Sequence, residues 1–452
     1  MFETTNIATV DFYHLILALL TAFLTAFATT PLVKKLAFRI KAVDVPKDNR
    51  RMHKKPMPLI GGLAIFLGFT VSAVVSRLIS VDTFRLQFLP LWCGAALIVI
   101  LGIFDDIFAL KPWLKFIGQF VAAAIPVVRG IMITDIFGIH IEAQWLSVIV
   151  TLIWIVGLTN AINLIDGLDG LACGVSSICC LILMVVSMLK SEPYVTMLTA
   201  ALAGAALGFL PYNLNPATIF MGDTGAMFLG YTLSVISIMG VFKLSAAVSF
   251  IIPIIIFGLP IFDTAFAIIR RVLSGRSPFA ADRGHLHHKL VDHGFNVKQS
   301  VLILYVICSI FGFFAIMVSE RKFSSVLTII IFAFLIGLFN LAMSHFSRNA
   351  SHKAKTETNA EENNNGQALT EQDLNTAATV PENTVFETQD EKTDAVGSSL
   401  PHTEQGAQET VTDTMDNNAA VQTETTKTET TKMEEEVVSP DLEPNAGNHL
   451  ST

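Results

Sequence analysis

Charged side chains are scarce in this sequence. Asp, Glu, Lys and Arg make up 15% of the 452 residues, whereas hydrophobic residues make up 52%. The five cysteines all fall in apolar runs without the spacing of a zinc site or a disulfide framework, so we interpret them as packing residues. The N-terminal Met-Phe-Glu-Thr-Thr lacks the basic segment and cleavage site of a signal peptide, which predicts that the first apolar stretch is retained. No separate soluble domain is evident.

The end of the chain lacks apolar periodicity. Between residues 347 and 452, Phe386 is the only aromatic residue, and such a composition cannot bury enough surface to order itself. This segment holds 6 Lys and Arg against 21 Asp and Glu, a net charge of −15, which leaves +7 for the rest of the chain. We therefore predict a transmembrane domain over residues 1–346 and a disordered acidic tail over residues 347–452.

Long apolar stretches recur along the first 346 residues. A helix needs roughly 17 to 25 apolar residues to cross a bilayer, and about eleven stretches approach that length. The predicted fold class is an all-α polytopic membrane protein with about eleven transmembrane helices. The stretches cover residues 10–32, 58–79, 88–105, 113–129, 145–162, 170–189, 195–211, 218–240, 246–269, 299–318 and 325–346.

Basic residues are distributed unevenly over the loops between these stretches. With eleven spans, the loops that would share one side hold 17 Lys and Arg, and the opposite loops hold 7. Because positive loops stay in the cytoplasm, we predict that the first set and the tail are cytoplasmic. Every dense cluster of Asp, Asn and His lies in that same set of loops. The polar chemistry is therefore expected on one face of the membrane.

The first cluster is a pair of adjacent carboxylates, Asp105 and Asp106, followed by Leu-Lys-Pro and Lys115. Carboxylates that border hydrocarbon are costly, which makes them functional candidates. The alternative is a solvated helix terminus.

The second cluster has the pattern Asn-x-x-Asn-x-x-Asp-Gly-x-Asp-Gly, from Asn160 through Asn163, Asp166 and Asp169 to Gly170. The first three polar residues share a face if the segment is helical. Ordinary turn and helix-cap chemistry is the alternative, although the polar density exceeds what a cap needs.

The third cluster contains Asn213, Phe220 and Gly222-Asp223-Thr-Gly at the start of another apolar stretch. Amides at a helix start favour phosphate oxygens. Asp223 is a hard oxygen ligand that suits magnesium, which typically uses one or two protein groups plus substrate phosphates. Phe220 could stack on a base, and simple packing is the alternative.

The fourth cluster is a basic loop that runs from Arg270 to His293 and includes Arg283 and His285-Leu-His-His. Three histidines suggest zinc, but no cysteine or acidic set completes a closed zinc site, and the arginines suit phosphate better. Together the four clusters indicate phosphoryl transfer between a nucleotide substrate and a lipid.

In this order, the motifs resemble those of the polyprenyl-phosphate N-acetylhexosamine-1-phosphate transferase superfamily, especially its bacterial UDP-N-acetylglucosamine:undecaprenyl-phosphate branch. The resemblance covers roughly residues 10–346. It implies transfer of N-acetylglucosamine 1-phosphate from UDP-N-acetylglucosamine to undecaprenyl phosphate, with release of UMP, as the first membrane step of O-antigen, common-antigen or teichoic-type glycan synthesis. The expected location is the bacterial cytoplasmic (inner) membrane.

The resemblance also implies the site and its partners. Catalytic roles fall on Asp105, Asp106, Asp166, Asp223, His285, His287 and His288. Substrate binding falls on Lys115, Asp169, Asn213, Phe220, Arg283, Arg51 and His53, and metal binding on Asn163 and Asp223. The implied cofactor is Mg²⁺, with Mn²⁺ as an alternative. Partners are the two substrates and the lipid bilayer, a homodimer is left open, and no nucleic acid is expected.

Two alternatives remain at this level. Leu286 interrupts the histidine run, which favours N-acetylglucosamine over the muramyl-pentapeptide donor of a related transferase, but another UDP-N-acetylhexosamine would use the same chemistry. A transporter would also have many spans and embedded carboxylates. Against a transporter, the polar groups lie at one face and no internal repeat is evident.

Overall fold

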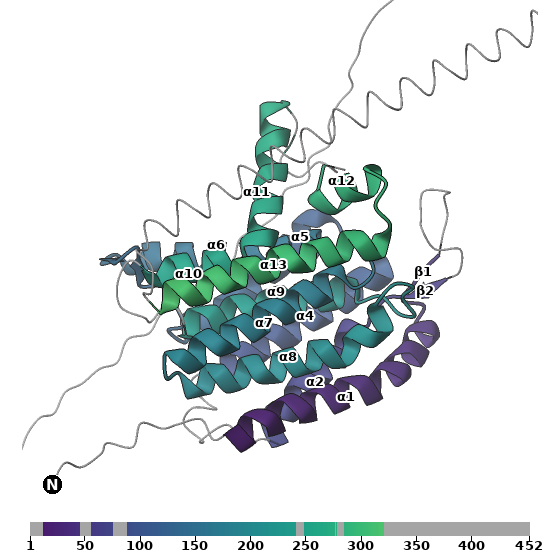
Figure 1. Ribbon diagram of the computed structural model, residues 1–452, viewed down its shortest axis with the longest axis horizontal. Coiled ribbons are helices and arrows are strands. Elements are labelled where there is room, and N and C mark those ends of the chain that lie inside the picture. Colours follow the sequence, from purple (N-terminus) through teal and green to yellow (C-terminus); the bar gives the residue numbers. More distant parts are fainter. Residues whose placement is uncertain are drawn as a thin grey trace, which may run out of the picture. The chain divides into compact units, whose positions relative to one another are not determined.

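Helices dominate the part of the chain that the structure describes (Figure 1). This computed structural model describes residues 12–45, 56–75, 88–240, 248–275, 277 and 284–320. All of these residues belong to one compact unit, Met1–Thr376. The helices are α1 Phe12–Arg39, α2 Gly62–Val75, α4 Leu89–Phe108, α5 Pro112–Val128, α6 Gln144–Leu164, α7 Leu171–Leu189, α8 Pro193–Asn213, α9 Gly222–Gly240, α10 Val248–Ile256, α11 Gly258–Leu273, α12 Leu286–Asp292 and α13 Val297–Ser319. The strands are β1 Val43–Asp44, β2 Met57–Pro58, β3 Asp135–Ile136 and β4 Ile139–His140.

The helices confirm a multi-pass membrane protein, but they do not confirm eleven spans. Among the described residues, six helices are long and apolar enough to cross a membrane: α1, α4, α6, α7, α8 and α13. The count reaches seven if α10 and α11 together form one span. The expected stretch 325–346 and the tail 347–452 lie outside the described residues.

One expected span is broken. The apolar stretch 246–269 was predicted as a single helix, but it forms α10 and α11, which meet at Phe257 with a bend of 83°. Gly258 and Pro260 directly follow the bend, and these residue types tolerate or cause helix breaks. Figure 1 shows α11 rising steeply from the run of α4, α7, α8 and α13.

Helix α9 is the centre of the bundle. Every residue from Thr224 to Gly240 is buried, and α9 contacts α2, α4, α6, α7 and α8. A helix that is enclosed on all sides needs small residues wherever its neighbours cross closely. A Cβ added to Gly62 of α2 would lie 2.1 Å from the Cα of Gly225, and one added to Gly102 of α4 would lie 2.4 Å from the Cα of Thr224. Both crossings therefore fix the first turn of α9.

A short hairpin extends this first turn. Strands β1 and β2 pair antiparallel, with Val43 opposite Pro58. The Phe220 amide donates to the Pro58 carbonyl at 2.9 Å, and the Phe220 carbonyl accepts from the Gly61 amide at 3.0 Å. The segment before α9 is thereby attached to the loop between α1 and α2. A second hairpin, β3–β4, lies in the connection between α5 and α6.

We predict that Gly62→Ala destabilises the protein, because the added methyl group has no room against Gly225. Overpacking of this kind costs about 1–3 kcal/mol, so the midpoint of thermal unfolding in detergent should fall. Gly157→Ala in α6 is the matched control, since its methyl group would meet nothing within 4 Å. At that position the higher helix propensity of alanine should increase the free energy of unfolding by about 0.5–1 kcal/mol. Equal midpoints for the two variants would contradict the close crossing.

Candidate functional site

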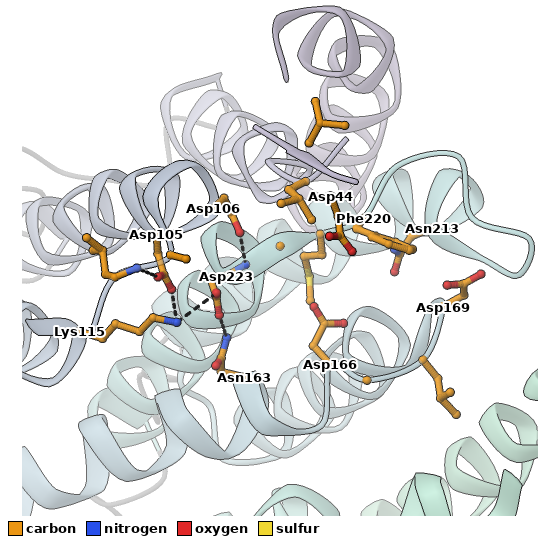
Figure 2. A pocket seen from close by; sticks show the side chains of 18 residues that line it. Asp44, Asp105, Asp106, Lys115, Asn163, Asp166, Asp169, Asn213, Phe220 and Asp223 are labelled. Atoms are coloured by element: carbon orange, nitrogen blue, oxygen red, sulfur yellow. Dashed lines mark hydrogen bonds and ion pairs between the residues drawn. The ribbon is translucent and has the colours of Figure 1, made fainter. Parts of the chain in front are cut away.

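A cavity of about 510 Å³ opens where α4, α6 and α8 end and where α5 and α9 begin (Figure 2). Three of the four predicted clusters meet there. The described residues that line the cavity include Asp44, Asp105, Asp106, Lys115, Asn163, Asp166, Asp169, Asn213, Phe220 and Asp223. Segments separated by more than a hundred residues thus supply one site, as the motif order predicted.

Lys115 and Asp223 form the middle of a polar chain across the cavity. The Lys115 ammonium is ion-paired with the carboxylate of Asp105 and lies 3.2 Å from Oδ2 of Asp223. Oδ1 of Asp223 accepts a hydrogen bond from the Asn163 side chain. Figure 2 shows these four side chains pointing toward one another. The two residues predicted to bind metal, Asn163 and Asp223, are therefore adjacent.

Asp106 is bound to the start of α9. Its Oδ1 accepts from the Asp223 amide at 2.9 Å, and its Oδ2 accepts from the Thr224 amide at 3.1 Å and the Thr224 hydroxyl at 2.6 Å. The first amides of a helix lack intrahelical partners, and a carboxylate there also meets the positive end of the helix dipole. Gly222 has φ +69°, and an added Cβ would lie 2.5 Å from Oδ2 of Asp106. Asp106 therefore acts as the N-terminal cap of α9 from another helix.

Asp105 faces a different direction from Asp106. Its Oδ1 accepts from the Leu110 amide at 2.8 Å, and its Oδ2 is the oxygen paired with Lys115. Helix α4 continues to Phe108, so both carboxylates lie on its last turn and not after its end, which was predicted at residue 105. The two adjacent carboxylates consequently have separate partners.

A pair of amide side chains lies one turn deeper in the bundle. Asn160 donates to Oε1 of Gln119 at 2.6 Å and to the Val156 carbonyl at 2.7 Å. Gln119 follows Lys115 by one turn of α5, and Asn160 precedes Asn163 by about one turn of α6. This half-buried contact joins the two helices and sets Lys115 opposite Asn163.

Asp166 lies in the turn between α6 and α7. A helix face shared with Asn160 and Asn163 would require a helical segment through Asp166, and α6 ends at Leu164, so only the two asparagines lie on α6. Burial, and after it the negative charge of Asp223, raise the pKa of Asp166 to about 8. The charges of Asp106 and Asp169 act on Asp166 in the same direction, so the raised pKa reflects how closely the carboxyl groups of the cavity lie to one another.

Asp169 supports the loop that precedes α9. Its Oδ2 accepts from the Asn215 side chain at 2.9 Å and from the Ala217 amide at 3.0 Å. The Asn213 side chain donates to the Ile219 carbonyl at 3.2 Å, while its buried Oδ1 has no hydrogen-bond partner among the described residues. Phe220 lines the cavity beside it. An unsatisfied buried oxygen that lines a cavity is suited to accept a hydrogen bond from a ligand.

Asp44 was not among the predicted site residues. It ends β1, lines the cavity and lies near Phe220 in Figure 2. The sequence shows it only as Asp-Val-Pro in a basic loop, and no periodicity connects that loop to the other motifs. Pairing of β1 with β2, and of β2 with the segment before α9, brings Asp44 to the site.

The histidines lie behind the cavity wall. His285 and His287 are buried, but neither lines the cavity. The ring of His287 packs against Gly167, where an added Cβ would lie 2.2 Å from Nε2. The ring centroids of His287 and His288 are 4.3 Å apart. Their catalytic roles stay predictions, and Arg51, His53 and Arg283 lie outside the described residues.

The donors in the cavity are compatible with magnesium. No group of three or more His, Cys, Asp or Glu in the described ranges is placed to hold a metal by itself. Magnesium commonly binds through one or two protein groups and completes its shell with water and substrate phosphates. Asp223 and the Asn163 amide supply such a pair. Six carboxylates and one lysine line the described part of the cavity, so a cation would also offset the surplus charge.

A bundle of apolar helices that ends in a carboxylate-rich cavity defines a multi-pass membrane enzyme. The family described as Glycosyl transferase family 4 matches residues 88–241. A probable undecaprenyl-phosphate N-acetylglucosaminyl 1-phosphate transferase of Bacillus subtilis is 42% identical over 312 residues, which cover 68% of this chain and 86% of that protein. The chain belongs to this family of polyprenyl-phosphate N-acetylhexosamine-1-phosphate transferases, which confirms the resemblance.

Two further relatives show the range of the family. A decaprenyl-phosphate N-acetylglucosaminephosphotransferase of Mycobacterium tuberculosis is 34% identical over 329 residues, covering 66% of this chain and 80% of that protein. A phospho-N-acetylmuramoyl-pentapeptide-transferase of Staphylococcus epidermidis is 32% identical over 254 residues, covering 50% and 76%. These relatives confirm that the chain is a transferase and give no support to the transporter alternative.

We predict that Thr224→Val weakens the start of α9. The substitution keeps the shape of the buried side chain but removes the hydroxyl donor to Asp106. A bond to a charged group contributes about 1.5–3 kcal/mol, so the midpoint of thermal unfolding should fall. Thr30→Val is the control, because the Thr30 hydroxyl is equally buried but bonds only to Ala26 of its own helix. A Thr224→Val midpoint no lower than the control would show that the hydroxyl bond to Asp106 does not stabilise the start of α9.

We predict that acid weakens the protein through His287. Burial, and then the nearby His288, lower the pKa of His287 from 6.5 to about 4. Between these values the unfolded chain binds the proton and the folded chain does not, so stability is lost as the pH falls from about 6.5 towards 4, by on the order of 3 kcal/mol. His287→Gln should flatten the pH dependence of the unfolding midpoint. The exposed His140→Gln should leave it unchanged, and identical profiles for all three proteins would exclude His287 as the cause.

Proposed function

We propose that this protein transfers N-acetylglucosamine 1-phosphate from UDP-N-acetylglucosamine to undecaprenyl phosphate and releases UMP. The observation that carries the proposal is the chain of Asp105, Lys115, Asp223 and Asn163 across a cavity at the ends of apolar helices. There a phosphate carried by a membrane lipid can meet a water-soluble nucleotide. The names of the Bacillus and Mycobacterium relatives, which combine a polyprenyl phosphate with N-acetylglucosamine, support this acceptor class and this sugar.

Magnesium is part of the proposal. Asp223 and Asn163 would hold it, and the ion would neutralise charge on the phosphate oxygens and orient them for in-line displacement. The amide of Asn163 presents either its nitrogen or its oxygen after a simple flip. Manganese has similar ligand preferences and is the alternative.

The charged residues of the cavity have distinct tasks in this proposal. Lys115 stands between two carboxylates, and it would move onto a phosphate oxygen when an anionic substrate enters. Asp105 would orient the lipid phosphate. That phosphate has a second pKa of about 6 and is already largely ionised at neutral pH, so a strong general base is not needed. Asp106 would stay on α9, because all of its described bonds hold that helix.

The opposite side of the cavity suits the nucleotide. Asp169 holds the loop that leads to Phe220, whose ring offers a flat apolar surface for a base. Oδ1 of Asn213 is buried, has no partner in the part of the chain that the structure describes, and can accept an N–H from the uracil ring. We assign the donor half of the cavity to Asp169, Asn213 and Phe220, and add Asp44 as a residue that borders it.

The sugar and its membrane side are further parts of the proposal. Leu286 within the histidine run favours N-acetylglucosamine over the muramyl-pentapeptide donor, while another UDP-N-acetylhexosamine is the second candidate. The excess of Lys and Arg in the loops that carry the polar motifs supports a site on the cytoplasmic side of a bacterial membrane. The product would then feed O-antigen, common-antigen or teichoic-type glycan synthesis.

We predict that the purified full-length protein releases UMP from UDP-N-acetylglucosamine only when both undecaprenyl phosphate and Mg²⁺ are present. Turnover is measured with labelled UDP-sugars, including UDP-N-acetylgalactosamine and the muramyl-pentapeptide donor. Asp223→Ala should reduce magnesium-dependent turnover more than about a hundredfold, since even outer-shell partners of a metal contribute about 10- to 100-fold.

Asp292→Ala is the matched control, because this carboxylate is exposed and lies outside the cavity. It should keep normal turnover. UMP release without the lipid would contradict the acceptor assignment, and full activity of Asp223→Ala would contradict the metal assignment.

A further inference from the structure

A buried carboxylate outside the cavity, Asp263, holds the segment that carries the histidines. Asp263 lies on α11, and its Oδ2 is 2.9 Å from Nδ1 of His285. Its Oδ1 accepts from the Leu286 amide at 2.8 Å. The side chains of Asp263 and His285 are only 8% and 6% exposed. Both oxygens of one carboxylate are thus used to hold two consecutive residues.

These two bonds define where α12 begins. His285 precedes the first residue of α12 and has an extended backbone, with φ −62° and ψ 150°, but its own side chain does not cap the helix. Asp263 supplies the missing acceptor for the first amide of the helix, which has no partner within α12. α12 has only seven residues, and a helix this short is not stable alone. Its position therefore depends on the contact with α11.

A second residue of α11 supports the same segment. Arg270 follows Asp263 by seven residues, about two helical turns, so the two share a face. The guanidinium of Arg270 packs on Gly284, where an added Cβ would lie 2.1 Å from one of its nitrogens. The bend of 83° between α10 and α11 turns this face toward the histidine segment. Neither contact could be expected from the residue pattern alone.

The segment in turn supports the wall of the cavity. The ring of His287 lies directly against Gly167, and this close approach requires glycine. Gly167 lines the cavity between Asp166 and Leu168, in the turn that also carries Asp169. The contacts therefore run from Asp263 through His285 and α12 to the turn of residues 165–170. That turn lies in the donor half of the proposed site.

Burying a carboxylate and an imidazole is not by itself a source of stability, because the cost of removing them from water offsets the attraction. What the pair does supply is a fixed geometry. We propose that Asp263 is a positioning residue for the donor half of the site: it orients His285 and α12 so that His287 holds the Asp166–Asp169 turn in place. The inference rests on the proposed function in one respect, the identification of the donor as UDP-N-acetylglucosamine.

The test compares Asp263→Asn, Asp263→Ala, His285→Asn and the double variant Asp263→Asn/His285→Asn with wild type, using the full-length protein. Asp263→Asn should raise KM for UDP-N-acetylglucosamine about tenfold, the effect of one bond to a charged group, and leave KM for undecaprenyl phosphate unchanged. His285→Asn should raise the donor KM similarly, and the double variant should add little, because residues that act through one contact are not additive. The exposed Asp292→Asn is the matched control. An equal loss of kcat with both KM values unchanged would overturn the proposal.

A second measurement does not depend on turnover. Diethyl pyrocarbonate labels accessible histidines, and mass spectrometry locates the label. In wild type, His285 and His287 should be protected while the exposed His140 is labelled. Asp263→Ala, or Asp263→Asn if the alanine variant does not fold, should expose His285 and His287, whereas Asp292→Asn should not. Unchanged protection in the Asp263 variants would overturn the proposal. Lost protection in a protein whose wild type shows no turnover would support the positioning role and refute the proposed function.

Discussion

The cap that Asp106 places on α9 is the interaction on which the site depends. α9 is buried from Thr224 to Gly240, and the first amides of a helix have no partner within it, so they need an acceptor from another part of the protein. Asp106 supplies that partner from α4, and the same contact fixes Asp223 one residue into the helix. The close crossing of Gly62 with Gly225 keeps this turn in place from the other side. A metal ligand placed on an exposed loop would lack this support.

Sequence alone predicted the chemistry of the site better than its geometry. The four motifs carry unusual polar density in apolar surroundings, and such residues are retained only for a reason. Hence Asn163, Asp166, Asp169 and Asp223 were found, and the cavity contains them. The sequence could not assign different roles to Asp105 and Asp106, because they are adjacent residues of the same type in one motif. Consecutive positions on a helix point about 100° apart, so only the structure could show that one meets Lys115 and the other α9.

The remaining differences have a common origin. The bend at Phe257, the hairpin that brings Asp44 to the site and the contact of Asp263 with His285 all depend on packing between distant segments. Asp263 is a single acidic residue in an apolar stretch, and composition predicts only that such a residue has a partner. Apolar length likewise predicted the positions of the helices but not the number that cross a membrane, because a buried helix and a spanning helix have similar composition.

The two halves of the cavity are supported in different ways. The half with Asp105, Lys115 and Asp223 is built on long helices that pack directly against the centre of the bundle. The half with Asp166 and Asp169 is a turn, and a short helix attached to α11 lies behind it. Rigid helices suit a reacting group whose position must not change, since small displacements reduce rate strongly. A turn held from behind can differ between relatives without disturbing that centre, so a family that keeps one phosphoryl-transfer chemistry can accept different nucleotide sugars.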